Sequence, residues 1–214
     1  MIRVHCYIDG FNLFHAIDDI SRASRGELNY YKWLNLSKLM AVFTDPKVHK
    51  IEQIKYFSAY PTWKPKQHEK HLIYVKALQS TGVNPILGQF KEKDIYCPEC
   101  GLTHKGHEEK ESDVNIAVHL ISDAYEDRFD HAFIVSRDSD LVGPIKYIRA
   151  KFPNKRIKVI APPLRRHSKE LWALANSQAS ISKLHLEKCL FDEIVLDAAG
   201  TKVCTRPASY APKA

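Results

Sequence analysis

The sequence predicts an α/β protein built on a mostly parallel central sheet. In the stretch 129–141, an apolar run ending at Val135 leads through polar residues into a helical pattern that begins at Leu141. A short buried run followed by a helix is typical of one β-α step in a parallel sheet. The chain also begins this way, with an apolar run that ends at Asp9 before a glycine and a helical pattern. Open α/β sheets hold their functional groups at the carboxyl ends of such strands.

Length and composition agree with one domain, or with one domain and an appendage. The chain has 214 residues, of which 44% are apolar, and this is enough to build a sizeable core. No stretch approaches the roughly 20 apolar residues of a membrane span, and the first strand is not preceded by a secretory signal pattern. We therefore expect a cytoplasmic protein with no membrane contact.

Charge and cysteine content narrow the class of partner. The net charge of +7 and the pI near 9.1 indicate a polyanionic partner, with nucleic acid as the first candidate. The five cysteines are an odd number scattered along the chain, unlike a secreted disulfide framework. Cys97 and Cys100 have the spacing of a metal-binding or redox pair. Carboxylates clustered in a basic protein would be explained by a cation between protein and phosphate.

Apolar spacing locates the elements of the first half of the chain. Ile2–Ile8 is the first expected strand, and Phe11–Ile20 is the helix after its turn. The next expected elements are a helix carrying Leu36, Leu39, Met40 and Phe43, a strand at Ile51–Ala59, a helix at His68–Ser80 and a strand at Val83–Phe90. Trp63 lies beside lysines in the loop 60–67, which joins the strand at Ile51–Ala59 to the helix at His68–Ser80. There it could stack on a single-stranded base or pack on the core.

Residues 91–110 are expected to form a small insertion with its own metal site. Cys97 and Cys100 have the spacing of a zinc knuckle, and His104 and His107 could supply two further ligands. The two histidines are closer in sequence than the three to five intervening residues that are usual. The alternative is a surface hairpin with two reduced thiols. Four protein ligands would make the zinc structural, because no position would be left for a reacting water.

The second half of the chain continues the alternation of strands and helices. A core-facing helix is expected from Ser112, with Val114, Ala117, Val118, Ile121 and Tyr125 on one face. Later expected elements are a helix at Leu141–Phe152, a strand at Arg156–Ile160, a basic loop at Ala161–His167 and a helix at Ser168–Asn176. We expect residues 1–180 to form the main domain and residues 181–214 an extension packed on it. A homodimer joined through that extension is an alternative.

Four aspartates stand at strand ends or helix starts, and they are Asp9, Asp113, Asp138 and Asp140. Each has a structural explanation when taken alone, since aspartate caps helices and compensates the helix dipole. Together at one sheet edge they would repel one another unless a cation lay among them. Ligands that are all oxygen favour Mg²⁺ or Mn²⁺, with water and substrate phosphate completing the shell. Such an ion can polarise a phosphodiester and activate a water molecule.

Three segments resemble the motifs of the NYN domain family, a LabA-like group of PIN-like nucleases. They are YIDGFNL at 7–13, EEKESDVNIAV at 108–118 and VSRDSDL at 135–141. The resemblance covers nearly the whole chain and implies a Rossmann-like, three-layer α/β/α sandwich of PIN type with an acidic metal pocket. The implied catalytic residues are Asp9, Asp113, Asp138 and Asp140, with Asn12 and Ser136 orienting water or metal. Arg137 departs from the family, which more often has a small residue there.

The resemblance implies a metal-dependent endoribonuclease that hydrolyses single-stranded or structured RNA. The residues expected to contact RNA are Lys91, Lys93, Lys110, Arg137, Arg165, Arg166 and Trp63. One alternative is an RNA-binding or regulatory protein that does not cleave, because an intact acidic set does not prove turnover. Another is a DNA nuclease. A nucleotide-dependent enzyme is disfavoured, since no glycine-rich phosphate loop follows the first strand.

Overall fold

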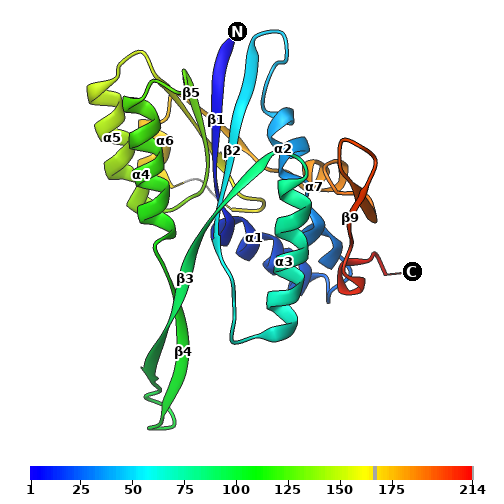
Figure 1. Cartoon of the computed structure of the whole chain (residues 1–214). Coiled ribbons are helices and arrows are strands. Elements are labelled where there is room, and N and C mark those ends of the chain that lie inside the picture. Colours follow the sequence, from blue (N-terminus) through cyan, green and yellow to red (C-terminus); the bar gives the residue numbers. More distant parts are fainter. Residues whose placement is uncertain (166–167, 214) are drawn as a thin grey trace.

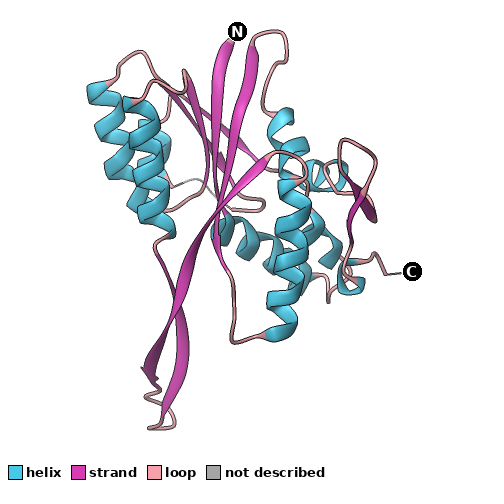
Figure 2. Ribbon diagram, in the orientation of Figure 1, coloured by secondary structure: helices cyan, strands magenta, loops and turns pink. Residues whose placement is uncertain are grey.

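The computed structural model describes residues 1–165 and 168–213. Across these residues the chain forms a seven-stranded sheet in the order β4-β3-β2-β1-β5-β6-β7, with helices on both faces (Figure 1 and Figure 2). Neighbouring strands are parallel, except for β3 and β4, which are antiparallel. The predicted class, a three-layer α/β/α protein with a mostly parallel sheet, is therefore confirmed.

The bounds of the elements are as follows. The sheet contains β1 (Ile2–Asp9), β2 (His49–Ala59), β3 (Val83–Tyr96), β4 (Thr103–Lys110), β5 (His131–Val135), β6 (Arg156–Ala161) and β7 (Ser177–Ser180). The helices are α1 (Gly10–Ala23), α2 (Leu36–Val42), α3 (Pro65–Gln79), α4 (Ser112–Tyr125), α5 (Val142–Lys151), α6 (Lys169–Leu174) and α7 (Lys183–Lys188). The 3-10 turns are η1 (Asn29–Trp33), η2 (Ser139–Leu141) and η3 (Ala208–Tyr210), and β8 (Ile194–Leu196) pairs with β9 (Lys202–Thr205) in a separate hairpin.

The central strands send alternate side chains into two cores. On β1, Val4, Cys6 and Ile8 join the core that includes α1, α2 and α3. Tyr7 joins the other core, which includes α4, α5 and α6. Strand side chains alternate with a period of two, so a strand covered on both faces must be apolar at nearly every position. Among the described residues, no helix is long and apolar enough to cross a membrane.

The strand order reverses between β1 and β5. From β1 the sheet extends through β2 and β3 on one side, and through β5, β6 and β7 on the other. Ile8 therefore pairs with Val135, although the two are far apart in the sequence. In doubly wound sheets, ligands bind in the crevice beyond the carboxyl ends of the strands at such a reversal. Asp9 ends β1 at this position, and Ser136 directly follows β5.

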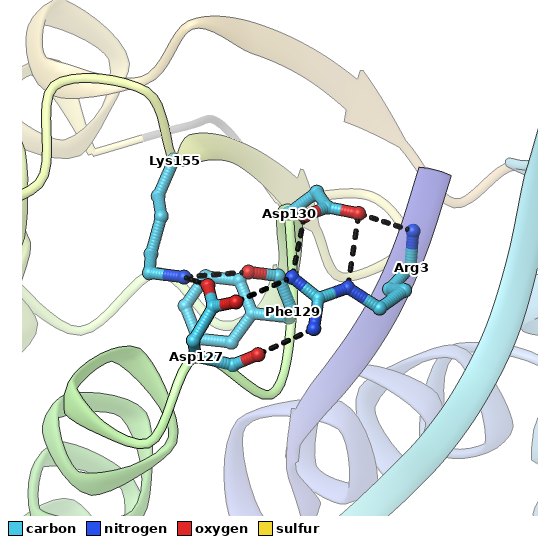
Figure 3. Close-up of polar contacts among 5 residues, drawn as sticks. All are labelled: Arg3, Asp127, Phe129, Asp130 and Lys155. Atoms are coloured by element: carbon cyan, nitrogen blue, oxygen red, sulfur yellow. Dashed lines mark hydrogen bonds and ion pairs between the residues drawn. The ribbon is translucent and has the colours of Figure 1, made fainter. Parts of the chain in front are cut away.

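A cluster of charged residues connects the segments at the amino ends of the central strands, opposite to the end that carries Asp9 (Figure 3). The Arg3 guanidinium donates to both oxygens of Asp130, at 3.2 and 2.8 Å. The Lys155 ammonium donates to Asp127 at 2.7 Å and to the carbonyl oxygen of Phe129 at 2.8 Å. The hydrogen bonds from Arg3 lower the pKa of Asp130 to about 2. The cluster holds β1 in line with the segments that lead into β5 and β6.

β3 and β4 form a long hairpin that projects from the body of the protein (Figure 1). We expected residues 91–110 to be a compact insertion after a strand ending at Phe90. Instead β3 continues to Tyr96 and the chain returns as β4. Nearly all side chains from residue 91 to residue 105 are exposed, so this part of the hairpin has no core to cover. The apolar alternation that marks a strand in a sequence is therefore missing.

Helix α4 buries a different face from the one that its apolar spacing predicted. Ile116 and Leu120 are fully buried, whereas Val114 and Val118 are 65% and 57% exposed. Asp123 is also buried on this helix. Because α4 has apolar residues on two faces, tertiary contacts rather than periodicity select the face that is buried.

The carboxyl-terminal segment packs against the body near η1. The Trp33 indole donates to the carbonyl oxygen of Asp192 at 2.9 Å, and the Tyr31 hydroxyl donates to Glu187 at 2.8 Å. The ring of Phe191 lies 5.5 Å from that of Trp33. These contacts hold the segment on the same side of the sheet as α1, α2 and α3.

Candidate functional site

The aspartates singled out in the sequence lie on three elements near the carboxyl ends of β1 and β5, where the strand order reverses. Asp9 is the last residue of β1, and Asp138 caps η2 just after β5. Asp140 lies within η2, and Asp113 lies in the first turn of α4. α4 packs on β1 and β2 from one face of the sheet. Consecutive sequence motifs thus converge on one end of the central strands.

Asp9 is the most buried member of this acid cluster, at 2% exposure. One of its oxygens accepts from the Asn12 backbone N–H at 2.9 Å. The other accepts from the Asn12 side-chain amide at 2.6 Å and from the Ser136 hydroxyl at 2.8 Å. A side chain at Gly10 would place its Cβ 2.5 Å from the carbonyl oxygen of Phe57, so the turn after Asp9 requires glycine. Burial raises the pKa of Asp9, and the hydrogen bonds from Asn12 and Ser136 oppose this effect.

The segment after β5 is held by a chain of short-range hydrogen bonds. The buried Ser136 hydroxyl, which donates to Asp9, accepts from the Asp138 N–H at 3.0 Å. The Asp138 carboxylate accepts from the Asp140 N–H at 3.0 Å. Asp140 itself is exposed, as is Arg137. Ser136 therefore joins the two sides of the crevice and fixes the backbone that presents Asp138.

Asp113 is half-buried and close to several negative charges. Burial and neighbouring carboxylates raise its pKa to about 6. The carboxylates that contribute are, in order of decreasing effect, Asp138, Asp9, Glu109 and Asp140. Each disfavours a second negative charge nearby, so the raised pKa reports that these acids share one electrostatic environment.

Glu109 is an additional acid at this position that the sequence analysis did not single out. Its carboxylate accepts from the N–H and the hydroxyl of Ser112, at 3.1 and 2.7 Å, and so caps α4. The residue before the helix, Glu111, has a positive φ of 83° and makes no side-chain cap. Glu109 lies within the family motif at 108–118, but its role depends on where β4 delivers it relative to α4.

The donor set suits a hard divalent cation such as Mg²⁺ or Mn²⁺. All the donors are carboxylate oxygens, and a cation would relieve the repulsion that raises the pKa of Asp113. Within the described part of the chain, no three of these acids have oxygens that all lie within 4.8 Å of one another. This spacing is compatible with Mg²⁺, which keeps several waters and takes only one or two protein carboxylates directly.

Residues 3–182 match the model of the NYN domain family. The chain belongs to the NYN domain family. This family is part of the PIN-like nuclease superfamily. A solved structure of a protein of unknown function from Vibrio parahaemolyticus RIMD 2210633 has the same fold, with a TM-score of 0.57 and 20% sequence identity. That match covers 85% of this chain and 94% of the other.

A relative with a described activity matches part of the chain. The 6-hydroxy-3-succinoylpyridine 3-monooxygenase of Pseudomonas putida (strain DSM 28022 / S16) is 26% identical over 195 residues. The match covers 75% of this NYN chain but only 60% of the monooxygenase. This NYN chain therefore spans well under the full length of that enzyme.

The expected zinc ligands lie at the tip of the β3–β4 hairpin of this NYN chain, away from the acid cluster. The ligand atoms of Cys97, Cys100 and His104 all lie within 4.8 Å of one another. His107 is not part of this group, and the expectation that it would complete the set needs correction. Three residues along a strand reverse the face on which a side chain lies, so His104 and His107 point to opposite sides of β4.

The Trp63 ring packs against the base of the hairpin. It stacks on the ring of His107 with centroids 3.8 Å apart and an interplanar angle of 3°. The Trp63 ring also meets the Phe90 ring edge to face, with centroids 4.5 Å apart. The Phe90 and Phe11 rings are likewise edge to face, with centroids 5.5 Å apart. The ring therefore packs on the hairpin and not on the core, and His107 covers one of its faces.

The lysines expected to contact RNA share one face of the hairpin. Lys91, Lys93 and Lys110 alternate with residues of the opposite face, to which Glu109 belongs. The Glu108 carboxylate accepts from Lys93 at 3.2 Å and from Lys110 at 3.0 Å. Part of this positive charge is therefore neutralised within the hairpin.

The arginines expected to contact RNA have different surroundings. Arg137 is exposed and directly precedes Asp138 in the segment after β5. Arg165 forms an ion pair with Asp19 of α1. Arg166 lies outside the described residues.

A buried polar network beneath α4 was not anticipated. The Asp123 carboxylate accepts from the Lys55 ammonium at 2.5 Å and from the Tyr7 hydroxyl at 2.6 Å, and the His5 ring lies 3.2 Å away. Burial alone would raise the pKa of Asp123, but these hydrogen bonds bring it well below its usual range. Since α4 also carries Asp113, the network anchors that helix to β1 and β2. No periodic pattern distinguishes Asp123 from a surface acid.

Proposed function

We propose that this protein is a metal-dependent ribonuclease that hydrolyses phosphodiester bonds endonucleolytically. The observation that carries the proposal is the convergence of Asp9, Asp113, Asp138 and Asp140 on the crevice where the strand order reverses. Membership of a PIN-like nuclease family supports the reaction class. The RNA substrate and the choice of Mg²⁺ or Mn²⁺ belong to the proposal.

In this proposal the four aspartates hold the cation, and their neighbours keep them in place. When bound, a divalent cation would polarise the phosphodiester and lower the pKa of an attacking water. Ser136 and Asn12 orient Asp9 through hydrogen bonds, and these bonds oppose the effect of burial on its pKa. Asp140 is exposed, which suits contact with the ion through a water molecule.

Positive charge supports a nucleic-acid substrate. The net charge of +7 favours binding to a phosphate backbone, and Arg137 lies exposed beside Asp138. An arginine at this position is suited to contact a phosphate next to the scissile bond. The hairpin lysines lie on the face of the hairpin away from Glu109. They would contact a part of the RNA that is farther from the scissile bond.

Cleavage of labelled RNA is the direct test. Wild-type protein with Mg²⁺ or Mn²⁺ should shorten a mixed single-stranded and structured RNA pool, and Asp138→Asn should not. Asparagine keeps the oxygen that accepts from the Asp140 N–H, so this variant removes charge with little change in the loop. Asp192→Asn, at an exposed aspartate of the carboxyl-terminal segment, is the matched control.

The outcomes separate the candidate functions. Unchanged cleavage by Asp138→Asn would place the reaction elsewhere in the protein. Salt-sensitive RNA binding without cleavage under either metal would favour the regulatory alternative. Cleavage of DNA in preference to RNA of the same sequence would reassign the substrate.

A further inference from the structure

We propose that Cys97, Cys100 and His104 bind one zinc ion at the tip of the β3–β4 hairpin, with a fourth position occupied by exchangeable water. The three ligand atoms lie within 4.8 Å of one another, and the Cys100 sulfur is 3.4 Å from Nε2 of His104. Two thiolates and an imidazole suit zinc and exclude the hard cation proposed for the aspartates. This inference does not depend on the nuclease proposal.

The backbone at the tip has the shape of a metal-binding knuckle. The Cys97 N–H donates to the carbonyl oxygen of Leu102, and the Gly101 N–H donates to that of Cys97, both at 2.9 Å. Gly101 has a positive φ of 68°, which allows the chain to turn back toward β4. The turn therefore brings Cys97, Cys100 and His104 together at one end of the hairpin.

The surroundings of the tip explain why a metal is needed there. Ile95, Tyr96 and Leu102 are 52%, 64% and 60% exposed, so no hydrophobic core holds the end of the hairpin together. An isolated two-stranded hairpin is at best marginally stable in water. A zinc ion that joins β4 to the turn would supply this stability, because metal binding energy is available to folding.

The proposed open position follows from the placement of His107. It lies on the opposite face of β4 from His104, and its ring is stacked on Trp63. The ligands from this chain are therefore two cysteines and one histidine, all near the exposed surface. A zinc ion with three protein ligands completes its tetrahedral shell with water.

Zinc content measured on purified full-length protein tests the ligand set. Wild type and His107→Ala should each hold about one zinc per chain, whereas Cys100→Ser and His104→Ala should hold almost none. Cys204→Ser, at a cysteine away from the tip, is the control and should retain its zinc. Far-ultraviolet circular dichroism should show a folded body in every variant, because the tip contributes to neither core. Wild-type protein that holds no zinc after dialysis against it, or unchanged zinc in Cys100→Ser and His104→Ala, would overturn the site.

Substitution with Co²⁺ tests the fourth position. The cobalt protein should show the visible bands of a tetrahedral site with thiolate ligands, and added imidazole should shift them by replacing the water. A spectrum that imidazole does not change, together with loss of metal in His107→Ala, would show a closed four-ligand site and overturn the open position.

Discussion

Replacing Ser136 with alanine removes the hydroxyl that connects the two sides of the crevice. This side chain is 1% exposed, so water cannot replace its hydrogen bonds without entering the core. It donates to Asp9 at 2.8 Å and accepts from the Asp138 N–H at 3.0 Å. A hydrogen bond to a charged group contributes roughly 1.5–3 kcal/mol, which corresponds to about a 10- to 150-fold change in an equilibrium or rate constant. We expect a loss of this size in Mn²⁺ affinity and in kcat/KM for RNA cleavage.

The same substitution should move the pH dependence. The hydrogen bond from Ser136 is one of those that oppose the effect of burial on Asp9, so its loss raises the pKa of Asp9 further. Because the carboxylate is the active form, the acidic limb of the kcat/KM profile should shift to higher pH. The assay is RNA cleavage with Mn²⁺ across about pH 5 to 8.5.

Two further variants separate this effect from a general loss of packing. Ser136→Cys keeps a weak donor and should fall between wild type and Ser136→Ala. Ser58→Ala removes another buried serine hydroxyl at the end of β2, where it contacts His71 at 3.4 Å, and should leave the pH profile unchanged. Mn²⁺ affinity and a pH profile for Ser136→Ala that both match wild type would refute the proposed role of the hydroxyl.

Three other predictions concern charge. Burial and neighbouring carboxylates raise the pKa of Asp113 to about 6, so it takes up a proton as the pH falls through this value. Calorimetry should therefore show that Mn²⁺ affinity falls by up to about tenfold per pH unit below about pH 6. Equal affinity at about pH 5 and 7 would contradict this. Lys55→Met leaves Asp123 without its cation and should cost about 3–5 kcal/mol in urea unfolding, whereas pairing it with Asp123→Leu should restore most of the loss. Because the pKa of Asp123 is lowered by its partners, this stabilisation is present above the ordinary aspartate pKa and is lost as the pH falls toward the folded value. Glu109→Gln keeps an acceptor for the α4 cap but removes a negative charge, so the pKa of Asp113, measured by NMR, should fall; an unchanged value would show that Glu109 does not act on it.

Most of the acid cluster could be predicted from local sequence patterns. Asp9 ends one apolar run and Asp138 lies three residues after another, and parallel strands place their carboxyl ends on the same side of the sheet. Asp113 and Asp140 stand at expected helix starts, and the family motifs contain both of them. Each of these inferences depends only on a strand end or a helix start and the few residues beside it.

Three features depended on contacts between distant segments. Glu109 joins the acids because β4 delivers it beside the start of α4. α4 turns Ile116 rather than Val114 toward the core, with Asp123 held by Lys55 of β2. His107 lies away from His104 because the charged stretch around it is a strand, which no apolar alternation revealed.

Periodicity and strand-end residues thus define the elements, the class of the fold and the general place of its acids. Packing among segments far apart in the chain decides which face of α4 is buried and which strands are neighbours. It also decides which polar groups form hydrogen bonds with one another. An exposed strand and a two-faced helix carry no local signal of their orientation. Their orientation is decided by the segments they contact. A buried charge is stable only beside a counter-charge, and an apolar face is stable only against a core.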